Sequence, residues 1–333
     1  MNTKNKTVGI TSTIPIEVVF AAGRRPVDLN NVFIASPNPE SYIRIAESEG
    51  FPTSICAWIK GIYGAIRKHR IREVIGVSGG ECSSTHALFE ILEFLGLKIH
   101  AFSYPYDRDA GVLKEELKKL CAGFKVTLTE AEKMKKVLDG VRQKVRRLDE
   151  LTFKENRVSG WENHLWTIQT SDFSGNYSRY EKKISHFLRE AEKRGPFRGN
   201  IRLGFIGIPP ICPDIYEQAE RRCARIVFNE FQRQFSMPNI TKNLVEQYRS
   251  YTYPYDVFFR IEDIKRQIAD RRIDGLIHYI QSFCFRGIQD RLLRETIGIP
   301  ILTLEFDRPA RLDSRSITRM EAFIEMLREK VAQ

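Results

Sequence analysis

The sequence predicts an α/β protein with two parallel-sheet domains, and three observations support this prediction. Apolar runs of strand length alternate with amphipathic helical stretches over residues 7–105, and the alternation resumes over residues 201–330. Such alternation is typical of parallel strands joined by crossover helices. The chain has 333 residues, whereas one domain usually has about 100–200. Between the two blocks lie charged helical stretches that end in the linker-like segment RGPFRGN.

We expect the domain boundary in that linker. The N-terminal domain would take in residues 1–195, with a helical insertion at about 110–194, and the C-terminal domain would take in residues 196–333. In open α/β sheets, ligands bind beyond the carboxyl ends of the strands. Residues that directly follow a predicted strand are therefore the first candidates for a functional site.

The elements of the first block follow from its apolar pattern. TVGIT at 7–11 is a short apolar run and is expected to be a buried strand. The elements expected after it are a short helix at 15–23, a strand at 27–34, helices at about 39–49 and 54–69, a strand at 73–78, a helix at about 83–95 and a strand at 98–105. The charged insertion is expected to be helical, with breaks at Ser159-Gly160 and Ser174-Gly175.

The second block repeats the pattern. The expected elements are a strand at 201–209, a helix from about 213, a strand at 224–230, helices near 240–250 and 260–272, a strand at 274–281, a helix at 285–296, a strand at 299–307 and a helix at 314–330. This order again alternates strand and helix, so the second sheet is expected to be parallel as well.

Composition excludes several classes of protein. The chain is 42% hydrophobic and 29% charged, which is ordinary for a globular protein and unlike a disordered or fibrous one. No window holds the ~18 uninterrupted apolar residues of a membrane span, so we expect no membrane partner. The net charge of +11 favours anionic partners. The basic residues are spread along the chain without a nucleic-acid-binding signature, so we expect no nucleic acid, and a phosphorylated small ligand stays a candidate.

The cysteine pattern indicates a reducing compartment. The polar and proline residues within the N-terminal apolar stretch do not fit a signal peptide, so a cytoplasmic location is expected and disulfides are not. No two cysteines have the CxxC spacing, which excludes thioredoxin-like, ferredoxin-like and zinc-ribbon sites. Any metal site must therefore combine cysteines that are distant in the sequence.

Three cysteines share one kind of position. Cys56 lies in the first turn of the helix expected at about 54–69, which Thr53 or Ser54 can cap. Cys82 follows the strand at 73–78, and Cys284 follows the strand at 274–281. A helix start favours a thiolate or an anionic cluster through its N–H groups and dipole. The alternative is that each is a small residue packed in a turn. Three thiolates with one open position would suit a [4Fe–4S] cluster better than zinc, which usually takes four protein ligands in structural sites.

The other cysteines are weaker candidates. Cys121 lies late in a charged helix and Cys223 lies where a helix meets a strand, so both read as packing or surface residues. Cys212 also follows a strand, and the sequence leaves open whether it is a ligand, a neighbour of the site or a loop residue.

Five segments, in order, resemble one family. They are VGITSTIPIEVVFAAGRRPVDL, GFPTSICAWIKGIYG, GECSSTHALFEILEFLG, DGLIHYIQSFCFRG, and IPILTLEFD with TRMEAFIEML, and three of them contain Cys56, Cys82 and Cys284. On these segments the chain resembles the cluster-bearing subunits of the 2-hydroxyacyl-CoA dehydratase and benzoyl-CoA reductase family. Residues from about 105 to 195 match only as charged helices.

The resemblance implies a fold, a cofactor and partners. It implies two flavodoxin-like domains with a [4Fe–4S] cluster in the cleft between them, held by Cys56, Cys82 and Cys284. It implies an ATP-hydrolysing iron–sulfur activator that supplies one low-potential electron, and an acyl-CoA substrate that is dehydrated or reduced through a ketyl radical. Many enzymes of this family are built from two different subunits, and for this chain a homodimer and a heterodimer with a related subunit both stay open.

The resemblance also gives a role to residues after the first strand. Glu17 could hold or protonate a leaving hydroxyl group, with Ser12 as a nearby hydrogen-bond donor. The alternative for Glu17 is a carboxylate that complements the dipole of the helix in which it lies. Arg24 and Arg25 could contact CoA phosphates or only solvent.

One branch of the family supplies an alternative function. It binds a double-cubane cluster through six cysteines and reduces small molecules, and this chain also has six cysteines. A double-cubane or electron-transfer iron–sulfur protein without CoA-thioester chemistry is therefore the second hypothesis. A metal-free ligand-binding α/β protein is the third.

Overall fold

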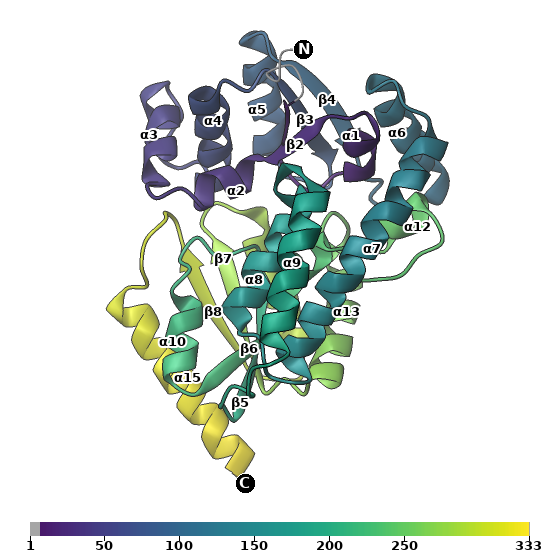
Figure 1. Cartoon of the computed structure of the whole chain (residues 1–333). Coiled ribbons are helices and arrows are strands. Elements are labelled where there is room, and N and C mark those ends of the chain that lie inside the picture. The colour runs from purple at the N-terminus through teal and green to yellow at the C-terminus, as the bar shows by residue number, and fades with distance from the viewer. Residues whose placement is uncertain (1–6, 333) are drawn as a thin grey trace. The chain divides into compact units, whose positions relative to one another are not determined.

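The structure contains two four-stranded parallel sheets with the same strand order. It is a computed structural model that describes residues 7–332 (Figure 1). The first sheet has the order β2-β1-β3-β4 and the second has the order β6-β5-β7-β8, and every pairing is parallel. In each sheet the first strand in sequence lies between the second and the third, as in flavodoxin-like folds. The predicted α/β class with two flavodoxin-like sheets is confirmed.

Contacts along the chain define two compact units, and each contains one sheet. Unit 1 takes in the chain up to Gln143, together with Gln169–Lys182 and Met237–Asp256. Unit 2 takes in Lys144–Ile168, Lys183–Ser236 and the chain from Val257 onward. Contacts rather than independent folding define these units, so the domain boundary at residue 195 stays a prediction.

Unit 1 surrounds its sheet with short helices. Its elements are β1 (Thr7–Ile10), α1 (Ile16–Ala21), β2 (Arg25–Asp28), α2 (Leu29–Ile34), α3 (Glu40–Ser48), α4 (Ala57–His69), β3 (Glu73–Gly79), α5 (Ser83–Phe94), β4 (Lys98–Ser103), α6 (Ala110–Gly123), the 3₁₀ helices η2 (Gln169–Ser171) and η3 (Phe173–Gly175), and α12 (Leu244–Arg249). The chain passes from one unit to the other within α7 (Leu128–Phe153) and within α9 (Tyr177–Ala191).

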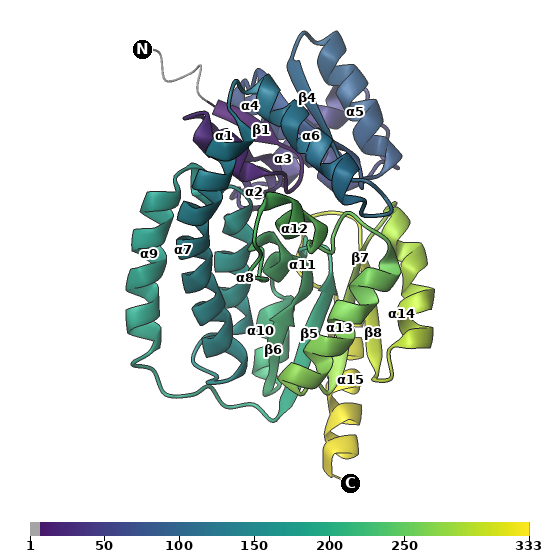
Figure 2. The same cartoon turned by 90° about the vertical axis from the view of Figure 1, so that its right-hand side faces the viewer.

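Unit 2 has the same alternation. Its elements are α8 (Gly160–Ile168), β5 (Ile201–Gly207), α10 (Ile215–Arg221), β6 (Ala224–Asn229), α11 (Glu230–Phe235), α13 (Val257–Arg271), β7 (Gly275–Gln281), the 3₁₀ helix η4 (Phe285–Gln289), α14 (Asp290–Thr296), β8 (Ile301–Phe306) and α15 (Ser314–Ala332). Figures 1 and 2 show α13 on one face of the sheet of unit 2 and α15 on the other. Within the described residues, no helix is both long and apolar enough to span a membrane.

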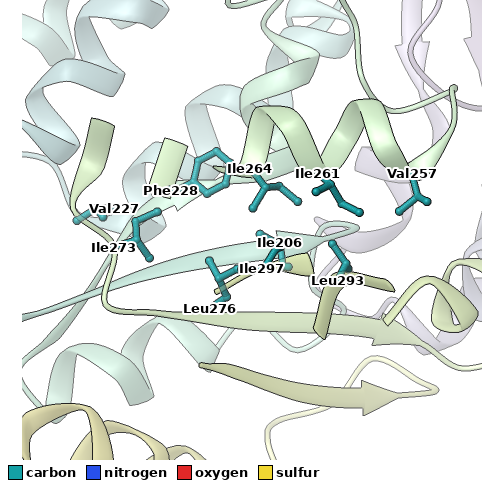
Figure 3. Close-up of a cluster of buried hydrophobic side chains, with 10 residues drawn as sticks. All are labelled: Ile206, Val227, Phe228, Val257, Ile261, Ile264, Ile273, Leu276, Leu293 and Ile297. Carbon is teal, nitrogen blue, oxygen red and sulfur yellow. The ribbon is translucent and has the colours of Figure 1, made fainter. Parts of the chain in front are cut away.

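The core of unit 2 shows why these apolar runs form strands and helices. Val257, Ile261 and Ile264 lie on one face of α13, at the spacing of successive helical turns, and pack toward Ile206 of β5 and Leu276 of β7 (Figure 3). The strands are covered by helices on both faces, so they carry nearly continuous apolar runs rather than alternating ones.

Two expected elements differ from those observed. The strand expected at 27–34 ends at Asp28, and its second half is helix α2. The Asp28 side chain accepts a hydrogen bond of 2.9 Å from the backbone N–H of Asn30 and so caps that helix. Leu29 and Phe33 lie four residues apart and are both buried, which is helical spacing. The helix expected at 285–296 begins as the 3₁₀ helix η4 before it becomes α14.

Helices α3 and α4 approach each other closely at one glycine. A Cβ atom added to Gly64 of α4 would lie 2.2 Å from the backbone carbonyl oxygen of Tyr42 in α3. Real Cβ atoms do not come this near to a backbone oxygen, so only glycine fits this position without a shift of one helix. The contact fixes α4, and with it the position of the helix start at Cys56, in unit 1.

Candidate functional site

The strand order marks one ligand-binding position at each sheet. In flavodoxin-like sheets the crevice lies at the carboxyl ends of the two strands between which the order reverses. These strands are β1 and β3 in unit 1, and β5 and β7 in unit 2. Ser12 follows β1 and Cys82 follows β3, whereas Cys212 follows β5 and Cys284 follows β7. Sequence-predicted candidates therefore stand at the crevice position of both sheets.

Cys56 and Cys82 are the N-cap residues of α4 and α5. Both side chains are partly buried, and both helices are long enough to place a positive dipole end and unpaired N–H groups at the first turn. The Sγ atom of Cys82 lies 3.8 Å from Oγ1 of Thr85 in that turn. The N–H groups and dipole of a helix start favour a bound anionic group at such a position.

A buried indole lies in the first turn after Cys56. Nε1 of Trp58 is buried and has no hydrogen-bond partner among the described residues. An indole N–H can only donate, and a buried donor without an acceptor costs free energy. Nε1 of Trp58 is therefore a buried donor in unit 1 that an additional acceptor, such as a bound anionic group, would satisfy.

Three hydrogen bonds fix the loop after β1. The Tyr104 hydroxyl donates to the carbonyl oxygen of Thr13 over 2.9 Å. The side-chain amide of Asn30 donates to the carbonyl oxygen of Thr11, also over 2.9 Å. The backbone N–H of Val77 in β3 donates to Oγ1 of Thr11 over 3.4 Å. Oγ1 of Thr13 is buried and has no partner among the described residues. Ser12 is partly buried in this same loop.

The turn that leads to Cys82 contacts the segment after α12. Gly80 has a φ of +97°, and a Cβ atom there would lie 2.6 Å from Cβ of Pro254. The hydroxyl of the neighbouring Tyr253 donates to Glu81 over 3.5 Å. The tyrosine-rich segment after α12 therefore contacts the turn that leads to Cys82 within unit 1.

Glu17 is fully buried and is held by three donors. Its Oε1 accepts hydrogen bonds of 2.7 Å from Arg142 of α7 and of 2.7 Å from Gln247 of α12, and its Oε2 accepts one of 2.7 Å from the hydroxyl of Tyr248. Glu17 is 0% exposed and Arg142 is 2% exposed, so this is a buried ion pair. Burial and the nearby Glu17 carboxylate raise the pKa of Tyr248 well above its usual value.

Sequence reasoning missed all three partners of Glu17. They lie 125, 230 and 231 residues away along the chain. A charged residue on a helix such as Arg142 normally faces solvent, and no spacing rule connects it to an N-terminal loop. Its pairing could be found only from the fold.

Cys284 lies beside two buried arginine side chains in unit 2. It lines a small cavity together with Arg260 and Arg286, which are 1% and 7% exposed. Arg260 donates to Glu230, through Nη2 over 2.9 Å, and to Gln289 of η4 over 3.1 Å. Arginine side chains at this cavity can donate hydrogen bonds to an anionic group bound there. Arg286 stands two residues after Cys284, so its place near this cysteine could have been predicted from the sequence, whereas that of Arg260 could not.

The remaining cysteines have different surroundings. Cys121 and Cys212 are 3% and 1% exposed, and burial raises the pKa of each thiol to about 11. Both are therefore neutral thiols at neutral pH. Cys223 is exposed and has a φ of 52° at the join before β6. None of these three cysteines has the helix-start position of Cys56 and Cys82. Their surroundings therefore do not favour a double-cubane cluster bound through all six cysteines.

Two histidines near the predicted ligands have other contacts. His86, in the helix that Cys82 caps, lies 2.7 Å from the carbonyl oxygen of Ser78 through Nε2. His278 lies 2.6 Å from Asp290 through Nδ1. Although burial opposes the shift, hydrogen bonds from His278, Arg294 and Thr303 lower the pKa of Asp290.

The three predicted ligands belong to different units. Cys56 and Cys82 lie in unit 1, and Cys284 lies in unit 2. Within the described residues, no three side chains of His, Cys, Asp or Glu gather as a metal site. The shared cluster site therefore stays a prediction, as do the roles of Ser12 and Glu17.

Comparison with known proteins identifies the family. No curated protein matches the chain. The sequence model of the family described as 2-hydroxyglutaryl-CoA dehydratase, D-component, matches residues 11–327, which include every strand of both sheets except β1. The match agrees with the resemblance carried by the five segments around the cysteines, and the chain therefore belongs to the 2-hydroxyglutaryl-CoA dehydratase D-component family, a lyase-type enzyme family.

Proposed function

We propose that this chain is the iron–sulfur subunit of a radical 2-hydroxyacyl-CoA dehydratase or acyl-CoA reductase. Its family supports a dehydratase-type component. The observation that carries the finer proposal is the placement of Cys56, Cys82 and Cys284. Each is partly buried and stands at a helix start. Cys82 and Cys284 also follow β3 and β7, at the sheet edge where α/β folds bind ligands.

The donor set fits a [4Fe–4S] cluster with three cysteine ligands. Several features favour an anionic group. They are the helix starts at Cys56 and Cys82, the unpartnered indole N–H of Trp58, and the arginines Arg260 and Arg286 beside Cys284. When bound, the cluster would transfer one low-potential electron to the carbonyl group of an acyl-CoA thioester.

The loop after β1 is proposed to bind the acyl group. Ser12 would donate a hydrogen bond from its hydroxyl, and the unpartnered Oγ1 of Thr13 offers a second polar atom in the same loop. Glu17 is proposed to exchange a proton with the leaving hydroxyl group. Because three donors hold its carboxylate, one of these donors would have to move before a carboxyl oxygen of Glu17 could exchange a proton with the substrate.

Two protein partners complete the proposal. An ATP-hydrolysing iron–sulfur activator would supply the electron, and a second subunit, either identical or related, would complete the enzyme. The net charge of +11 supports an acidic surface on such a partner and the phosphates of CoA as a ligand.

Substitution of single cysteines tests the cluster site. After anaerobic purification, Cys56→Ala, Cys82→Ala and Cys284→Ala should each lose most of the bound iron and sulfide, because a cluster with two protein thiolates is unstable. Cys121→Ala and Cys223→Ala are the matched controls and should keep both. Equal iron in all five variants would rule out the three-ligand site.

A turnover assay separates this function from the electron-transfer alternative. The protein, its activator, ATP and a 2-hydroxyacyl-CoA should give the unsaturated acyl-CoA product. A protein that keeps its cluster and accepts electrons, yet neither dehydrates nor reduces any CoA thioester supplied, would instead be an electron-transfer protein.

A further inference from the structure

Unit 1 has a basic pocket at the edge of its sheet that lies away from the candidate site. The pocket has a volume of about 890 Å³ and is lined by Thr7 of β1, Arg25 of β2 and Glu73 of β3, the first residues of those strands. Volumes of ~300–1,000 Å³ are usual for small-molecule sites. The amino ends of parallel strands form the edge opposite to Ser12 and Cys82, so this pocket is separate from the proposed acyl site.

Positive charge dominates the rim of the pocket. Arg24, Arg25, Lys68, Arg70 and Arg72 line it, and all except Arg24 are exposed. Within the described part of the chain, neither Arg70 nor Arg72 forms a salt bridge. Such arginines can bind phosphate oxygens in a bidentate manner.

The only acidic residue that lines this pocket among the described residues is already neutralised. Glu73 accepts hydrogen bonds from Lys98 over 3.1 Å and from His100 over 2.8 Å, and it also pairs with Arg24. Although burial opposes the shift, these partners lower the pKa of Glu73 to about 2. The carboxylate is therefore balanced by its own neighbours, and the charge of the other arginines is not cancelled.

The floor of the pocket is apolar. Val27, Leu29 and Val32 contribute from β2 and α2, and Ala65 and Ile71 contribute from α4 and the segment after it. A flat basic surface would suit an acidic protein, whereas a concave site with an apolar floor and a basic rim suits a small ligand that has an apolar ring and a phosphate group.

We propose that this pocket binds a phosphorylated ligand of nucleotide size, with phosphates on Arg25, Arg70 and Arg72 and an apolar ring on the floor formed by Val27, Val32 and Ala65. The ligand chemistry is shared by free nucleotides and by the phosphorylated adenosine of CoA. The proposal does not depend on the cluster or on the acyl site.

The backbone at Arg70 provides a clean variant. Arg70 ends α4 in the left-handed conformation, with a φ of 54°. Glycine is the residue that best fits this position. Arg70→Gly should therefore be at least as stable as the parent, so a loss of binding in this variant cannot come from misfolding.

Calorimetric titration with ADP, CoA and adenosine tests the proposal. ADP, CoA or both should bind, and adenosine should bind at least tenfold more weakly. The double substitution Arg70→Glu with Arg72→Glu should weaken anion binding at least tenfold, and Arg70→Gly should weaken it several-fold. Arg44→Glu with Arg179→Glu is the matched control, because both residues are exposed in unit 1 but lie outside the pocket, and it should leave binding unchanged.

The comparison of ligands identifies the source of the phosphate group. A pocket-dependent signal for ADP points to a free nucleotide, and one for CoA alone points to the thioester carrier. CoA binding that survives the double substitution Arg70→Glu with Arg72→Glu is assigned to the acyl site and is not evidence for the basic pocket. If no ligand shows a component that these substitutions remove, or if adenosine binds as tightly as ADP, the proposal is wrong.

Discussion

The carboxylate of Glu17 combines a proposed chemical role with a structural one, and both can be measured. Glu17→Gln removes the buried counter-ion of Arg142 and leaves its guanidinium with only the more exposed carboxylate of Asp139, 3.3 Å away. Breaking a buried ion pair costs about 3–5 kcal/mol of unfolding free energy. If Glu17 also transfers a proton, turnover should fall by about 10²–10⁴. Urea unfolding and turnover by the activated enzyme would measure the two effects.

A second substitution separates the two roles of Glu17. Combining Glu17→Gln with Arg142→Gln replaces the ion pair by two neutral amides, so most of the lost stability should return. If turnover stays low in the double variant, the carboxylate takes part in the chemistry. If turnover recovers together with stability, Glu17 only holds α1 against α7 and α12.

Asp172 predicts a pH dependence of stability. Burial and the nearby Asp28 raise its pKa to about 7, whereas an unfolded Asp has a pKa near 3.9. The folded state then binds more protons than the unfolded state between about pH 4 and pH 7, so this residue makes the protein less stable as the pH rises through that range. The contribution is at most about 4 kcal/mol, at ~1.4 kcal/mol per unit of pKa.

Asp172→Asn should reveal this contribution. The backbone N–H of Asp28 donates to Oδ2 of Asp172 and that of Ser174 donates to Oδ1, so the single amide oxygen of asparagine can keep only one of these hydrogen bonds at any pH. We therefore expect the stability of the variant relative to the parent to be higher at pH 8 than near pH 4.5. Urea midpoints at both pH values check the result, and a difference that does not change with pH would contradict it.

At the scale of single residues, the sequence predicts candidates whose position relative to a strand or a helix start follows a local pattern. It misses residues that only tertiary packing brings to the site. The cysteines could be placed because a cysteine after a strand or before a helix can be recognised from local pattern. Arg142, Gln247 and Tyr248 surround Glu17 from more than 100 residues away, so nothing local indicates their role.

Two glycines in helices show how differently single elements respond to the same change. Gly64→Ala would place Cβ 2.2 Å from the Tyr42 carbonyl oxygen. It should cost about 1–3 kcal/mol or more, because α3 and α4 must move apart. Gly140 lies within α7 and has no atom within 4 Å of its added Cβ, so Gly140→Ala should stabilise the protein by about 0.5–1 kcal/mol. Thermal unfolding of both variants checks the opposite signs.

The sequence predicts the existence of strands and helices better than their ends. The apolar stretch at 27–34 has β-branched residues, which favour a strand, and the i,i+4 spacing of Leu29 and Phe33, which favours a helix. The N-cap at Asp28 stabilises the helix that follows residue 28. Such a cap is a short-range signal that competes with apolar content. Long periodic segments such as α4 and α13 contain no such conflict and match their expected ranges closely.

At the scale of the whole molecule, the interleaved units predict how fragments behave. Gln247 and Tyr248 belong to unit 1 although they follow residue 195, so a fragment of residues 1–195 lacks two of the donors that hold Glu17. We expect this fragment not to unfold cooperatively by itself, and we expect co-expression with residues 196–333 to restore a folded complex. Near-ultraviolet circular dichroism during urea unfolding would measure this. Cooperative unfolding of the fragment alone would instead support the boundary at residue 195.

The interleaving also sets an order of events during synthesis on the ribosome. The chain moves between the units five times, after Gln143, Ile168, Lys182, Ser236 and Asp256. Unit 1 cannot close until residue 256 has left the exit tunnel, by which time most of the first sheet has been exposed for many seconds at ~5–20 residues per second. The nascent chain therefore presents the apolar strands β1 and β3 to chaperones and to other chains long before the last segment of unit 1 arrives, which makes its yield in a cell depend on the speed of translation.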